Sequence, residues 1–124
     1  MLLRLFRSRI LATLWFIAMC VLFFLPGSTL PQTGWLASIP HVDKIFHVGL
    51  FAVLLFLMSS SYFYVYMPRW VGYLLLGALV YGLLVEFIQK YWIPNRSFDL
   101  YDVMADMGGS VAGILVWLWV YRKK

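Results

Sequence analysis

The sequence predicts an all-α, polytopic membrane protein, a four-transmembrane-helix bundle with both termini in the cytoplasm. The 124-residue chain is 64% hydrophobic and only 12% charged, whereas an ordinary soluble domain has roughly 25% charged residues. It contains four long apolar runs, and its basic residues gather at the ends of these runs. A soluble chain of this length could not bury so much apolar surface, so we expect lipid to solvate most side chains.

The apolar runs define the predicted membrane spans. These are residues 10–25, 45–67, 70–92 and 100–121. Each is near the roughly 20 residues needed to cross a hydrocarbon core about 30 Å thick. The first span follows an arginine-rich start, and we interpret it as a retained signal anchor. Residues 26–44, which contain three prolines, are expected to form a non-cytoplasmic loop, and residues 1–124 a single membrane domain.

The charges between the spans predict the orientation. Seven basic residues and no acid lie on the side of the chain termini: Arg4, Arg7, Arg9, Arg69, Arg122, Lys123 and Lys124. The other side carries all five acids and three basic residues, Lys44, Lys90 and Arg96. The positive-inside rule therefore places both termini in the cytoplasm. No basic stripe follows a polar face, which argues against a nucleic-acid partner.

The rise of an α-helix predicts that three ionisable residues lie at similar depths. At 1.5 Å per residue, Asp106 lies about 22 Å from the inner end of the fourth span and Glu86 about 24 Å from that of the third. His47 lies about 30 Å from the inner end of the second span, at the outer boundary. Three helices are thus expected to bring ionisable groups together near the outer leaflet.

Helical spacing also places these groups on packed faces. Asp99, Asp102, Asp106, Gly109 and Gly113 follow one another at three- and four-residue intervals and share one stripe. A second stripe contains Ala78, Gly82 and Glu86, with Gln89 or Lys90. Small residues at such spacing allow close approach of membrane helices, so the acids are expected to face the bundle interior.

The candidate binding residues are Asp43, Lys44, His47, Glu86, Gln89, Arg96, Asp99, Asp102 and Asp106. Structural roles compete with binding. Asp99 could cap a helix and Asp102 could favour the positive end of a helix dipole. The basic residues could be interfacial cations, and His47 a hydrogen-bonded core histidine. Glu86 and Asp106 could lock helices together, but carboxylates within the hydrocarbon are costly and by default indicate a functional site.

The same residues carry a family resemblance. The segments Asp43-Lys44-Ile45-Phe46-His47, Glu86-Phe87-Ile88-Gln89, and Arg96 to Asp102 with Asp106 and Gly109 resemble, in order, the D-K-x-x-H, E-x-x-Q and R-x-x-x-x-x-D-x-x-x-N-x-x-G patterns of the VanZ-like family. The resemblance covers residues 41 to 116, with the first span as a variable leader. Asp106 stands where that family usually has asparagine. The resemblance implies a multi-pass protein of the bacterial cytoplasmic (inner) membrane, in a family whose namesake is linked to resistance to the glycopeptide teicoplanin.

Three functions remain open on the sequence. The first is binding or transport of a polar cell-envelope headgroup, such as a lipid-linked phosphate or sugar or a glycopeptide-related group, at an outer-leaflet pocket; this favoured reading requires no cofactor. The second is a metal-dependent enzyme in which the acids and His47 hold a divalent cation, although no established catalytic motif is present. The third is an accessory subunit whose polar cluster only locks the helices. The partner expected is a membrane lipid or lipid-linked headgroup, and a homo-oligomer is left open.

Overall fold

The described part of the chain is helical. A computed structural model describes residues 2–24, 42–62, 67–93 and 99–122, and among these residues there is no strand. The helices are α1 (Leu2–Phe6), α2 (Arg9–Phe23), α3 (Val42–Tyr62), α4 (Pro68–Trp92) and α5 (Leu100–Arg122). The sequence does not predict the short helix α1, and α3 begins before the predicted end of the 26–44 loop. Lys44 therefore lies in the first turns of a helix, not in a loop.

Local chemistry explains where helices begin. Ser8 separates α1 from α2 and caps α2, since its hydroxyl oxygen accepts a hydrogen bond from the Leu11 amide at 3.3 Å. Pro68 occupies the first turn of α4, where its fixed backbone angle suits a helix and its missing N–H costs nothing.

Three helices are long and apolar enough to cross a membrane: Lys44–Tyr62, Pro68–Trp92 and Leu100–Tyr121. They agree with the second, third and fourth predicted spans. The α2 helix is apolar but only 15 residues long, so the count of four spans stays a prediction. Large apolar side chains on the outside of the helices, such as Leu76 (59% exposed) and Leu115 (58% exposed), are suited to lipid and poorly suited to water.

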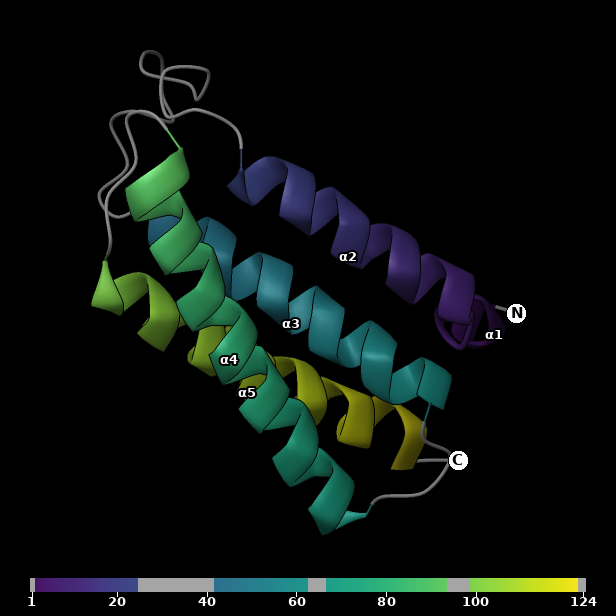
Figure 1. Ribbon diagram of the computed structural model, residues 1–124. Coiled ribbons are helices and arrows are strands. Elements are labelled where there is room, and N and C mark those ends of the chain that lie inside the picture. Colours follow the sequence, from purple (N-terminus) through teal and green to yellow (C-terminus); the bar gives the residue numbers. More distant parts are fainter. Residues whose placement is uncertain (1, 25–41, 63–66, 94–98, 123–124) are drawn as a thin grey trace.

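The core lies around α3, which contacts α2 on one side and α5 on another; Figure 1 shows α2 and α3 running side by side. The closest approach is between α3 and α5. A Cβ added at Gly109 would collide with the Val48 carbonyl group, and one at Gly113 with the Ala52 carbonyl group. The glycine stripe predicted from the sequence therefore lets these two backbones touch.

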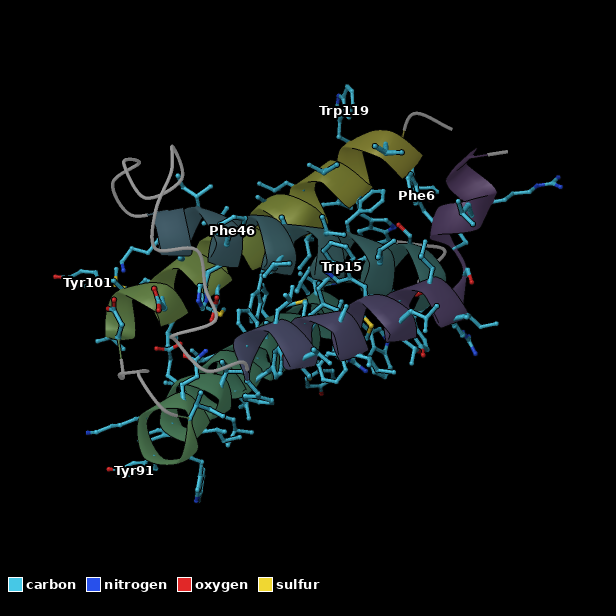
Figure 2. The ribbon with its side chains drawn as sticks, turned by 90° about the horizontal axis from the view of Figure 1, so that it is seen from above. Phe6, Trp15, Phe46, Tyr91, Tyr101 and Trp119 are labelled. Atoms are coloured by element: carbon cyan, nitrogen blue, oxygen red, sulfur yellow. The ribbon has the colours of Figure 1, made fainter. Side chains whose placement is uncertain are left out.

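The start of the chain and the end of α5 lie at one end of the bundle (Figure 1). The Arg7 guanidinium group lies 4.5 Å from the centre of the Tyr121 ring, and Phe6 packs edge-on against Phe56 near the end of α3. In Figure 2, Phe6 and Trp119 lie at this end, whereas Tyr91 and Tyr101 point outward at the other. That other end carries the polar residues.

Candidate functional site

The site lies where α3 and α5 begin and α4 ends. The first turns of α3 contribute Lys44 and His47, the last turns of α4 contribute Glu86, and the first turns of α5 contribute Asp102 and Asp106. Four of these five residues are buried, and Glu86 and Asp106 have no exposed surface. The predicted convergence of ionisable groups from three helices is confirmed.

His47 and Asp106 form the innermost contact. The Nδ1 atom of His47 lies 2.6 Å from Oδ1 of Asp106. When the Asp106 carboxylate is ionised it can only accept, so Nδ1 donates, and in a neutral imidazole the lone pair is then on Nε2. This Nε2 lies 3.7 Å from Oδ2 of Asp102. The ring of Phe23, in the last turn of α2, stacks on the imidazole with centroids 4.9 Å apart, so His47 is held on an edge and a face.

Lys44 lies at the rim of the site. Its Nζ donates to Oδ2 of Asp99 at 2.8 Å and to Oδ1 of Asp102 at 3.3 Å. The hydrogen bond from Lys44 holds the pKa of Asp99 below its ordinary value. The other oxygen of Asp99 accepts from the amide of Tyr101 at 2.9 Å, so the capping role considered for Asp99 is present at the start of α5. The Lys44 side chain keeps 23% of its surface exposed and Asp99 keeps 32%.

Glu86 crosses from α4 to the segment preceding α5. Its Oε1 accepts the backbone N–H of Asp99 at 2.9 Å, whereas its Oε2 is buried without a hydrogen-bond partner among the described residues. Oδ2 of Asp106 is likewise buried without a hydrogen-bond partner among the described residues. Gly82 admits this atom, because a Cβ there would lie 2.7 Å from it. Two buried carboxylate oxygens are thus available to a donor or a cation.

Gln89 makes a contact between helices that the sequence does not predict, and its role in binding stays a prediction. Its Nε2 donates to the carbonyl oxygen of Phe23 at 2.7 Å, and therefore ties the end of α2 to α4. Phe23 itself is a site residue that sequence reasoning missed, because nothing in an apolar run distinguishes an aromatic that stacks on a histidine. Arg96 lies outside the described residues, as does the side chain of Asp43.

The site contains more carboxyl groups than basic groups. Among the described side chains, Lys44 and His47 face the carboxyl groups of Glu86, Asp99, Asp102 and Asp106. One ligand atom each from His47, Glu86 and Asp102 lies within 4.8 Å of the others, and all three residues are buried. The site can accept hydrogen bonds from hydroxyl or ammonium groups, or hold a cation.

An apolar cavity of about 300 Å³ lies at the opposite end of the bundle. Its lining comes from the end of α3 and the start of α4: Met58, Tyr62, Trp70, Tyr73 and Leu74. Its lining is almost entirely apolar, so this cavity is separate from the cluster of ionisable side chains.

Three apolar helices of membrane-spanning length, which pack around a polar cluster at one end, indicate the class of protein: a helical membrane protein with a cluster of ionisable side chains between its helices. The VanZ/LLP1 family model matches residues 2–121, nearly the whole chain, and the protein belongs to this family. The match confirms the resemblance and extends it over the first predicted span. No curated protein and no solved structure matches the chain.

Proposed function

We propose that this VanZ/LLP1 protein binds the polar headgroup of a lipid-linked cell-envelope intermediate, a phosphate-bearing sugar, in the outer leaflet of the bacterial cytoplasmic membrane. A binding protein and a transporter would both need this binding step. Through headgroup binding, the protein contributes to glycopeptide tolerance. The observation that carries the proposal is a pair of buried carboxylate oxygens, one on Glu86 and one on Asp106, that have no hydrogen-bond partner within the part of the chain that the structure describes. Such oxygens are expensive in a hydrocarbon environment unless a ligand or ion satisfies them.

The distribution of charge supports the placement in the outer leaflet. The basic start of the chain lies against the end of α5 through Arg7 and Tyr121, and the acids lie at the other end of the bundle. The positive-inside rule assigns the basic end to the cytoplasm. A fourth crossing by α2, with its arginine-rich start drawn toward the interface, brings both termini to that side.

The donor and acceptor pattern supports a sugar-bearing headgroup. Sugar hydroxyls donate hydrogen bonds, and the carboxylate oxygens of Glu86 and Asp106 can accept them. Lys44, at the exposed rim, is placed to meet a phosphate oxygen. A bare phosphate would be repelled by the surrounding acids, so recognition depends on the hydroxyls as well.

The test is mass spectrometry of the lipids that co-purify with the detergent-solubilised protein. We expect the wild-type protein to be enriched in lipid-linked phosphosugars relative to the total membrane extract, and Glu86→Gln to lose the enrichment. Lys90→Gln is the matched control, because Lys90 is exposed near the same end of α4 and contacts the ring of Tyr91 instead of the site.

Lys44→Gln keeps the test decisive if the Glu86 variant does not fold, because Lys44 lies at the partly exposed rim. Absence of enrichment in the wild-type protein, or equal enrichment in a folded site variant, would refute the proposal. Loss of yield in both variants without any lipid in the wild type would instead support a cluster that only locks the helices.

A further inference from the structure

Three ligand atoms of mixed chemistry converge in the buried site. His47 offers an imidazole nitrogen, and Glu86 and Asp102 each offer a carboxylate oxygen, from three different helices. We propose that His47, Glu86 and Asp102 together bind a divalent transition-metal cation, with Zn²⁺ as the ion of choice. The inference deepens the proposed function, because a cation here would bridge to the phosphate of a headgroup, but binding of the ion needs no headgroup.

The orientation of His47 is the first argument. Its Nδ1 is engaged by Asp106 at 2.6 Å, which leaves Nε2 directed toward Asp102 at 3.7 Å. A metal-binding histidine almost always donates its other ring N–H to a carboxylate or carbonyl, which fixes the tautomer and raises the basicity of the ligating nitrogen. Asp106 is in the position of that supporting carboxylate, and Phe23 stacking prevents the ring from turning.

The unpartnered oxygen of Glu86 is an independent argument. The Glu86 side chain is completely buried, its Oε1 is used by the Asp99 amide, and its Oε2 has no hydrogen-bond partner among the described residues. Asp102, in turn, is held through its Oδ1 by Lys44 at 3.3 Å, while its Oδ2 faces His47. Glu86 is thus fixed by one oxygen and presents the other, and Asp102 lies with its Oδ2 toward the same imidazole.

The dimensions suit a small ion. The three ligand atoms lie within 4.8 Å of one another, and a zinc ion bound at about 2.0–2.2 Å by nitrogen and oxygen requires them to draw in by roughly 1 Å. Small rotations about the terminal bonds of the Glu86 and Asp102 side chains, with their hydrogen bonds kept, can supply this movement. A bound cation would also favour the ionised form of the carboxyl groups, which outnumber the basic groups around His47.

The ligand set also indicates which ions are disfavoured. Mg²⁺ and Ca²⁺ prefer oxygen ligands alone, whereas imidazole with carboxylates suits zinc and other first-row cations. Three protein ligands leave a fourth position open. An anionic oxygen could reach an acid-lined site through that position, which explains how a phosphate would be tolerated beside Glu86 and Asp102.

The experiment measures metal binding by the full chain in a detergent without metal-binding groups. The purified protein is stripped with a chelator and titrated with Zn²⁺ by calorimetry and, separately, with Co²⁺ by visible absorption. We expect about one ion per chain and Co²⁺ bands typical of a nitrogen–oxygen site, with no comparable binding of Mg²⁺. Glu86→Gln and Asp102→Asn should abolish the bands. Asp106→Asn should weaken Zn²⁺ binding by about 10- to 100-fold, as loss of a supporting carboxylate does.

Asp99→Asn is the matched control, because it removes one negative charge from the same cluster without removing a proposed ligand and should retain Zn²⁺. Monodisperse elution and unchanged helical circular dichroism qualify each variant; if Glu86→Gln fails to fold, Asp102→Asn and Asp106→Asn decide. The inference is overturned if wild-type protein gives no Co²⁺ bands, if a folded ligand variant binds Zn²⁺ as the wild type does, or if Asp99→Asn loses as much as Asp102→Asn.

The two proposals fail separately. Zinc binding without lipid enrichment would leave the metal site standing and refute headgroup binding. Lipid enrichment in protein that binds no metal would refute the metal site alone.

Discussion

Substitution of two adjacent glycines in α5 separates helix packing from helix propensity. Gly109 lies against the backbone of α3, where an added Cβ would collide with the Val48 carbonyl, whereas a Cβ at Gly108 would meet nothing within 4 Å. The perturbation is therefore Gly109→Ala, with Gly108→Ala as its control. Both positions are helical and differ by one residue.

The magnitude follows from two opposing effects. Replacing glycine by alanine inside a helix stabilises it by roughly 0.5–1 kcal/mol, and both variants share this gain. Overpacking costs about 1–3 kcal/mol and applies at Gly109 alone. The cost should lie in the upper part of that range, because the atoms in the way belong to a helix backbone and no side-chain rotation relieves the collision. The shared gain cancels in the comparison, so we expect Gly109→Ala to be less stable than Gly108→Ala by about 2–3 kcal/mol.

The assay is reversible unfolding in mixed micelles with increasing denaturing detergent, followed by circular dichroism. Gly108→Ala should be as stable as the wild type or more so, and Gly109→Ala less stable. If the two variants have the same free energy of unfolding, the backbones of α3 and α5 are not in contact at this point. Gly113→Ala should repeat the result of Gly109→Ala, because its Cβ would collide with the Ala52 carbonyl.

Three further predictions concern the contacts of α2 and the rim of the site. Gln89→Leu removes the hydrogen bond to the Phe23 carbonyl and should destabilise the fold by about 1–3 kcal/mol, with faster amide exchange at the end of α2; unchanged exchange would contradict this role. Trp15→Phe removes the 3.1 Å hydrogen bond from Nε1 to the carbonyl of Leu50 and should cost about 0.5–1.5 kcal/mol in the unfolding assay, so full stability would exclude a contribution. Lys44→Met removes the ammonium group that lowers the pKa of Asp99; carboxyl-carbon NMR should show that pKa rising toward its ordinary value, and an unmoved pKa would assign the shift to another group.

Much of the site follows from spacing alone. An α-helix fixes both the depth and the face of each residue, so the stripe from Asp102 to Gly113 and the stripe from Ala78 to Gln89 can be read from the sequence. Both are buried in the structure. The pairing of His47 with Asp106 does not follow from spacing, because the helical rise sets His47 about 8 Å further toward the outer boundary than Asp106.

The remaining features depend on contacts that no local pattern encodes. The amide of Gln89 looks like a site donor in the sequence, yet it is used by a carbonyl of α2 that lies 66 residues away. Phe23 is one of many aromatics, and only tertiary packing selects it to stack on His47. The extent of α3 differs because the sequence reading followed apolar character, whereas a helix can begin in polar residues such as Lys44 before it enters lipid.

The backbone contact between α3 and α5 has a mechanical consequence. Two helices whose backbones touch at glycine cannot slide or separate without losing their closest packing. The packed pair α3 and α5 therefore forms one rigid unit, which carries Lys44, His47, Asp102 and Asp106. Glu86 belongs to a different helix, α4, and its Oε1 accepts a hydrogen bond from the Asp99 amide at the start of α5. A displacement of α4 that widens the site would also pull on the end of α2, because Gln89 donates a hydrogen bond to the Phe23 carbonyl. Ligand binding at the site and the position of α4 would then be coupled.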